Sequence, residues 1–223
     1  MRLGDGQDTV TFGSGSADVH AGHGNDIILG GDGPAHIILG DGNDLIRLGS
    51  GQHLLSVGSG TETIWSAGGS TTLQAGDGDD VIRLGNGDAL VRVGDGADSV
   101  SLGDGNATIF AGNGADTISA GHGQHLIHLG SGNTTVSLGN GSHTVIAAGG
   151  HDVVRAGSGQ LYFSGGSGSD TVFAGDGAAT EVGGSGNNEL HAGNAPFLLQ
   201  GSGGDDTLWG GNGQGDPSRR RWQ

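Results

Sequence analysis

Large aliphatic residues recur every nine positions along most of the chain, and a second apolar residue follows each of them two positions later. Val10, Ile28 and Ile46 belong to the first series, and Leu48 to the second. A spacing of two places both residues on the same face of an extended strand, while the residue between them, such as Arg47, faces water. Each nine-residue unit therefore predicts one short strand with a single apolar face.

Two series of glycines share this period, and they give the unit the form G-x-G-x-D-x-U-x-h, in which U is large and aliphatic and h is apolar. Residues 40–48 and 112–120 are clear examples. Two glycines in nine residues would cost an α-helix about 1 kcal/mol each, so the unit is a glycine turn followed by a strand. One such strand buries almost nothing alone, but stacked copies share a continuous core. We therefore predict a solenoid with two nonapeptide units in each coil and one strand in each of two facing sheets.

Acidic residues occupy the D position of alternate units only. The intervening units have residues such as Ala17, His53 and Ala107 there, and never an acid. The true repeat is therefore an eighteen-residue pair of units, and one edge of the solenoid carries a stack of side chains that we call the acidic column. The column reads Asp8, Asp26, Asp44, Glu62, Asp80, Asp98, Asp116, Thr134, Asp152, Asp170, Asn188 and Asp206.

Carboxylates stacked in this way repel one another. Strands lie about 4.8 Å apart, and at that distance two charges repel by roughly 3–4 kcal/mol at an effective dielectric near 20. The chain has no Lys to neutralise them. Carboxylates and the carbonyl groups of glycine turns are ligands that suit Ca²⁺ better than Mg²⁺. The alternative is that Asp only caps local backbone groups in glycine-rich turns, which would not confine the acids to one edge.

Composition narrows the class of protein further. There are 53 Gly but only 3 Pro, which excludes collagen, and there is no Cys for disulfide bonds. The net charge of −16 argues against nucleic acid and anionic lipid as partners. The sequence has no apolar stretch long enough for membrane insertion and begins without a recognisable signal peptide.

The unit closely resembles the calcium-binding nonapeptide of the repeats-in-toxin (RTX, hemolysin-type) family, GGxGxDxUx, as residues 22–28 and 40–46 illustrate. The resemblance implies an all-β, right-handed parallel β-roll (β-solenoid), calcium bound between loops one coil apart, and export by a type I secretion apparatus. It also implies a set of calcium ligands in which Glu62 and Asn188 are the weaker members. These ligands are Asp8, Asp26, Asp44, Glu62, Asp80, Asp98, Asp116, Asp152, Asp170, Asn188 and Asp206.

We expect one continuous roll over residues 1–213 and a C-terminal tail over 214–223. The repeat is regular to about residue 160 and degenerate over 161–213, where Glu181 takes an inward aliphatic position and Pro196 and Phe197 replace turn residues. Thr134 interrupts the acidic column.

Three histidines, His53, His125 and His143, fall at the D position of the other edge. They suggest either a transition-metal site or polar turn filler, and we favour the filler. No nucleophile elbow and no zinc-protease motif stands out, so we expect no enzymatic activity.

The function that we expect is calcium binding by a secreted protein that folds when calcium binds, outside the cell or at its surface. One alternative is a self-assembling or adhesive structural protein that associates end to end through uncapped strand edges. Another is the repeat region of a larger type I secreted enzyme or toxin. The expected partners are calcium ions and the secretion apparatus, without nucleic acid and without membrane insertion.

Overall fold

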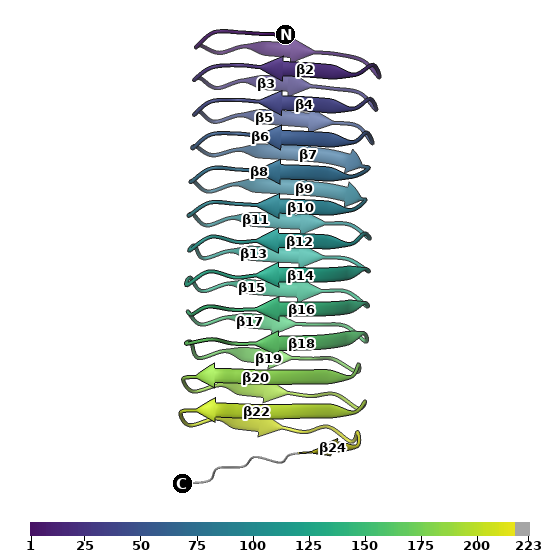
Figure 1. Ribbon diagram of the computed structural model, residues 1–223, viewed down its shortest axis with the longest axis vertical. Helices are drawn as coiled ribbons and strands as arrows, with labels where there is room; N and C mark the ends of the chain where they lie inside the picture. Colours follow the sequence, from purple (N-terminus) through teal and green to yellow (C-terminus); the bar gives the residue numbers. More distant parts are fainter. Residues whose placement is uncertain (217–223) are drawn as a thin grey trace.

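Short parallel strands stack into two facing sheets along the whole described chain. The computed structural model describes residues 1–216 (Figure 1). The odd-numbered strands form one twelve-stranded sheet, the odd sheet, and the even-numbered strands form the other, the even sheet. The strands are β1 (Thr9–Thr11), β2 (Ala17–His20), β3 (Ile27–Leu29), β4 (Ala35–Ile38), β5 (Leu45–Leu48), β6 (His53–Ser56), β7 (Thr63–Gly68), β8 (Thr71–Gln74), β9 (Val81–Asn86), β10 (Ala89–Arg92), β11 (Ser99–Leu102), β12 (Ala107–Phe110), β13 (Thr117–Ala120), β14 (Gln124–His128), β15 (Thr135–Leu138), β16 (Ser142–Ile146), β17 (Val153–Arg155), β18 (Gln160–Ser164), β19 (Thr171–Phe173), β20 (Ala179–Ser185), β21 (Glu189–His191), β22 (Phe197–Gly203), β23 (Thr207–Trp209) and β24 (Gly215–Asp216).

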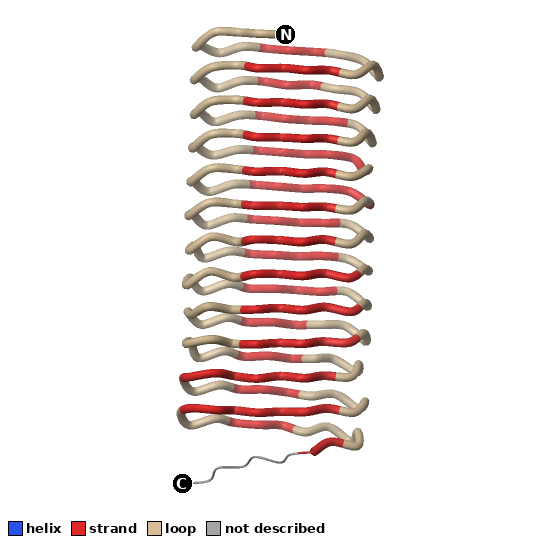
Figure 2. The backbone as a smooth tube through the Cα atoms, in the orientation of Figure 1, coloured by secondary structure: helices blue, strands red, loops and turns tan. Residues whose placement is uncertain are grey.

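Each strand pairs in parallel with the strand two units away, and the register stays constant from coil to coil. Val10 pairs with Ile28 in the odd sheet, and Val19 pairs with Ile37 in the even sheet. Figure 2 shows the result as a ladder in which strands form the two faces and loops form the two edges. The prediction of an all-β parallel β-roll with two nonapeptide units per coil is confirmed. Residues 1–216 contain no helix, and so none that is long and apolar enough to cross a membrane.

The core lies between the two sheets and consists of the periodic aliphatic residues. Ile28 and Ile46 from the odd sheet and Ile37 and Leu55 from the even sheet are completely or almost completely buried. Burying one such side chain contributes roughly 1.5–3 kcal/mol. Because the core is continuous from coil to coil, each strand is stabilised by its neighbours rather than by contacts within its own unit.

Glycine is required in the turns because successive coils approach closely there. At Gly24, φ is +146°, and an added Cβ would overlap the carbonyl oxygen of Gly6 in the preceding coil. Only a residue without a side chain fits at this distance. The glycine series is therefore a consequence of stacking one turn on another.

The degenerate part of the sequence still follows the same path. Glu181 lies on β20 at a core position, as predicted, between Phe163 of β18 and Leu199 of β22, and it is completely buried. Strands β20 and β22 are the longest of the described strands, with seven residues each. Residues 217–223 of the predicted C-terminal tail lie outside the described residues.

Candidate metal-binding edge

The acidic column lies at one edge of the roll, and each member immediately precedes a strand of the odd sheet. Asp26 stands before β3, Asp44 before β5 and Asp98 before β11. The backbone fixes this alignment, because the carbonyl oxygen of each member from Asp8 to Asn188 accepts a hydrogen bond from the first strand residue of the next coil. The Ile27 amide donates to the Asp8 carbonyl at 2.8 Å, for example. The predicted single-edge stack is therefore present.

Almost the entire column is buried, which the sequence alone did not indicate. The side chains at the two ends, Asp8 and Asp206, are partly exposed. Every member between them is at most 3% exposed. These buried members are Asp26, Asp44, Glu62, Asp80, Asp98, Asp116, Thr134, Asp152, Asp170 and Asn188. A buried carboxylate is costly unless each of its oxygens has a partner.

One oxygen of nearly every column carboxylate has such a partner. Oδ1 of Asp98 accepts a hydrogen bond from the backbone amide of Asp80, one coil earlier, at 2.9 Å. Equivalent bonds of 2.8–3.0 Å reach Asp26, Asp44, Asp80, Asp116, Asp152, Asp170, Asn188 and Asp206. Backbone capping, which we considered as the alternative to calcium, therefore does occur, but between coils rather than within one turn.

The second oxygen of these carboxylates is buried and has no hydrogen-bond partner. This applies to Oδ2 of Asp26, Asp44, Asp80, Asp98, Asp116, Asp152 and Asp170, and to both carboxylate oxygens of Glu62. A buried acceptor without a partner costs about 1–3 kcal/mol, and more when it is charged. Capping thus accounts for one oxygen of each carboxylate, and the other oxygen stays free to bind a cation.

Without a cation, the column disfavours its own ionisation. Burial raises the pKa of Asp98 and of Asp152 to about 7, and that of Asp44 and of Asp170 to about 6. Burial, reinforced by the neighbouring Asp80, raises the pKa of Glu62 to about 9. A divalent cation beside these groups would reverse the effect and hold them in the charged form.

Carbonyl oxygens of the turn glycines lie beside the carboxylates. A Cβ added to Gly114 would overlap the carbonyl oxygen of Gly96 and would lie 3.0 Å from Oδ1 of Asp116. The same convergence occurs at Gly168, where the Gly150 carbonyl oxygen and Oδ1 of Asp170 meet. At these two turns a glycine carbonyl oxygen of one coil therefore lies close to the carboxylate of the next coil, on the side of the Oδ1 that also accepts a backbone amide. This donor set fits calcium, which prefers several oxygen ligands in a loose arrangement.

At the opposite edge, none of the described D positions holds a carboxylate, and acids such as Asp104 lie in exposed turns instead. His53, His125 and His143 are buried there, and Nε2 of each lies 3.1–3.2 Å from the carbonyl oxygen of the glycine four residues earlier. The rings of His125 and His143 stack at 5.0 Å and 5°. Burial lowers the pKa of both histidines. These contacts agree with the interpretation of the histidines as polar turn filler.

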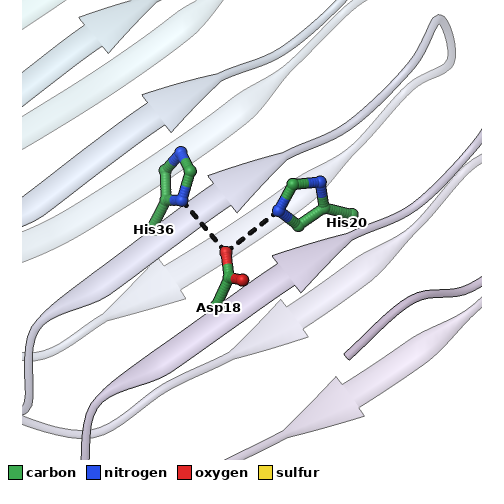
Figure 3. A group of neighbouring side chains, drawn as sticks. All are labelled: Asp18, His20 and His36. Carbon is green, nitrogen blue, oxygen red and sulfur yellow. Dashed lines mark hydrogen bonds and ion pairs between the residues drawn. The ribbon is translucent and has the colours of Figure 1, made fainter.

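One group of potential ligands was not predicted from the repeats. Asp18, His20 and His36 bring one ligand atom each within 4.8 Å of one another on the outer face of the even sheet (Figure 3). The sequence does contain the signal, because Asp18 and His20 are two residues apart and His36 follows Asp18 by one coil. The predicted ligands all came from turn positions, whereas these three residues occupy outward strand positions.

Comparison with known proteins gives one positive result. The family model described as RTX calcium-binding nonapeptide repeat matches residues 20–52, 56–91, 65–100, 92–124, 101–136, 128–160, 162–180 and 198–214, which together cover well over half of the chain. The search of curated proteins and the search of solved structures found no match. Proteins with these repeats bind calcium in general. On the basis of this match and of the β-roll, the chain belongs to the RTX calcium-binding nonapeptide repeat family.

Proposed function

We propose that this protein binds calcium ions along the acidic column and that binding stabilises the roll. The proposed ligands are the column residues Asp8, Asp26, Asp44, Glu62, Asp80, Asp98, Asp116, Asp152, Asp170, Asn188 and Asp206, together with carbonyl oxygens of the adjoining glycine turns. The observation that carries the proposal is the row of buried second carboxylate oxygens without partners, which within residues 1–216 occurs at one edge only. Calcium binding satisfies these oxygens and compensates for the repulsion between them.

Folding and binding are linked in this proposal. Without calcium, the carboxylates of the column must either stay charged and repel one another, or stay protonated at a pH above the usual pKa of a carboxyl group. With calcium the binding free energy adds to the free energy of folding. Extracellular calcium modules have dissociation constants of about 10⁻⁴–10⁻³ M. Such an affinity would keep the roll loosely folded at the low calcium concentration inside a cell and would close it after export by a type I apparatus.

A calcium titration with measured stoichiometry tests the proposal. Isothermal titration of the full chain should give a number of ions set by one edge, about half the number expected if both edges were loaded. Asp152→Asn should lower that number or weaken binding, because it removes a charged ligand oxygen. The matched control is Asp104→Asn in an exposed turn of the opposite edge, where the neighbouring Asn86 makes the same type of backbone contact.

Two results would count against the proposal. A stoichiometry that is the same in Asp152→Asn as in the parent chain would show that the column does not hold the ions. Circular dichroism that does not change when a chelator removes calcium would separate binding from folding.

A further inference from the structure

We propose that Asp18, His20 and His36 form a binding site for a divalent transition metal, with Zn²⁺ as its representative ion, on the outer face of the even sheet. The site is separate from the acidic column and does not depend on the calcium proposal. The strands that carry it are β2 and β4, near the N-terminal end of the roll (Figure 1).

The backbone register brings the three residues together. Asp18 and His20 are two positions apart on β2, so their side chains lie on the same face of the sheet. Asp18 pairs directly with His36 of β4. The two imidazole rings are 5.6 Å apart between centroids and nearly perpendicular, at 86°. No loop takes part, so rigid strand backbone positions all three side chains.

The three ligand atoms already converge. Oδ1 of Asp18 lies 3.0 Å from Nε2 of His20 and 3.0 Å from Nδ1 of His36 (Figure 3). Ligand atoms around a tetrahedral zinc ion with bonds of 2.0–2.1 Å are about 3.3 Å apart. The carboxylate oxygen therefore needs to move from each histidine nitrogen by only a few tenths of an ångström, and the two nitrogens lie within 4.8 Å of each other.

The donor types select the metal. Two imidazole nitrogens and one carboxylate oxygen make up a common three-residue zinc set, in which water completes the coordination. Calcium prefers oxygen ligands, so the site discriminates against the ion proposed for the column.

Exposure makes the site accessible without unfolding. His20 and His36 are half-buried, and Asp18 is exposed. All three face solvent beside the strands rather than the core. A simple hydrogen-bonded cluster, with Asp18 joining two histidines, is the competing explanation of the same geometry, and metal titration separates the two.

The test is a zinc titration of the full chain in excess calcium, which competes with zinc for sites made only of oxygen ligands. We expect one equivalent of zinc, and Co²⁺ should give an absorption spectrum of a nitrogen-ligated ion. His20→Ala and His36→Ala should each weaken zinc binding by more than about tenfold, which is within the range seen even for residues that merely support a ligand. His128→Ala is the matched control, because His128 lies on β14 of the same sheet and stacks on Phe110 instead.

A second measurement guards against variants that fold poorly. In the parent chain, zinc should shift the imidazole NMR signals of His20 and His36 and leave those of His128 unchanged. The proposal is wrong if no zinc binds in excess calcium. It is also wrong if both His20→Ala and His36→Ala still bind one equivalent of zinc and zinc leaves the imidazole signals of the parent chain unmoved.

Discussion

The side-chain amide nitrogen of Asn188 donates hydrogen bonds to Oδ1 of Asp206, at 3.0 Å, and to the carbonyl oxygen of Gly186, at 3.1 Å. Its Oδ1 accepts a hydrogen bond from the Asp170 amide at 2.9 Å, as the aspartates of the column do for the preceding coil. The amide nitrogen of Asn188 thus has two hydrogen-bond partners at the position where an Asp would have an Oδ2 without a partner. Asn is therefore the neutral replacement that preserves the contact between coils while removing a charged ligand.

Asp98→Asn should have opposite effects on stability with and without calcium. In a chelator at pH 8, the variant should be more stable than the parent chain, by up to roughly 4 kcal/mol, because burial raises the pKa of Asp98 to about 7 and the variant has no charge to bury. In saturating calcium it should be less stable, because a ligand is lost. Thermal unfolding followed by circular dichroism under both conditions measures the two differences.

Asp104→Asn serves again as the control for this reversal, since Asp104 lies in an exposed turn of the other edge. Its unfolding temperature should change little under either condition. If Asp98 had only a capping role, Asp98→Asn would change stability by the same amount with and without calcium, contrary to our expectation.

Thr134→Asp should join the two parts of the acidic column. Thr134 is buried at a column position between Asp116 and Asp152, and its own amide donates to Oδ1 of Asp152 at 2.8 Å. A carboxylate there would add an oxygen ligand next to two existing ones. We expect a higher calcium stoichiometry in titration calorimetry and greater stabilisation by calcium, together with lower stability in a chelator.

Thr71→Asp provides the matched comparison. Thr71 is an equally buried threonine at the equivalent position of the opposite edge, paired with His53 and Ala89. Neither of its two neighbours in register carries a carboxylate that could share an ion, so a new carboxylate there should destabilise the roll with and without calcium. Rescue of Thr71→Asp by calcium, to the level of Thr134→Asp, would contradict the assignment of binding to a single edge.

Glu181→Leu should stabilise the roll increasingly as the pH rises. Burial raises the pKa of Glu181 from 4.5 to about 8, and neither carboxylate oxygen has a partner. The folded state therefore holds the proton more tightly than the unfolded state, so the contribution of Glu181 to stability falls as the pH rises from about 4.5 to about 8. At pH 8 the variant should gain on the order of 4 kcal/mol, since one pKa unit corresponds to about 1.4 kcal/mol.

The difference between Glu181→Leu and the parent chain, measured by denaturant unfolding at fixed calcium from pH 5 to pH 8, isolates this group. Leucine fits the site because Leu199 occupies the equivalent position one coil later. Asp104→Asn, in an exposed turn, should show no such trend. A difference that stays constant over this pH range would mean that Glu181 keeps its charge in the folded state.

Much of this architecture could be predicted from the sequence because a strict period fixes register. Ile28 and Ile46 had to stack once each coil contained two units, and the same arithmetic placed Asp26 beside Asp44. The inward position of Glu181 followed in the same way. The period alone determines which residues of successive coils stack and which face of the strand each residue occupies. Predicting these two features therefore required no knowledge of side-chain conformation.

Side-chain geometry could not be predicted in this way. Nothing in the repeat indicates that Asp98 turns Oδ1 toward the Asp80 amide and leaves Oδ2 without a partner, because that depends on rotamers and on the spacing of the coils. The burial of the column also depends on how closely the turns stack. The group of Asp18, His20 and His36 lies outside the pattern, since outward strand positions are not constrained by the core.

His143→Leu should reduce the sensitivity of the roll to acid. Burial lowers the pKa of His143, so the folded state disfavours the charged ring, and the contribution of His143 is present above the unfolded pKa of 6.5 and is lost as the pH falls below it. Leucine is tolerated in this column because Leu161 follows one coil later, and the Gly139 carbonyl that contacts His143 also accepts the Gly157 amide at 3.1 Å. The variant should match the parent chain at pH 8 and exceed it in unfolding temperature at pH 5, in saturating calcium.

His23→Leu, in an exposed turn, is the control that should lack this gain. An equal gain in both variants would mean that loss of positive charge anywhere on the roll, rather than burial of the ring, sets the response to acid.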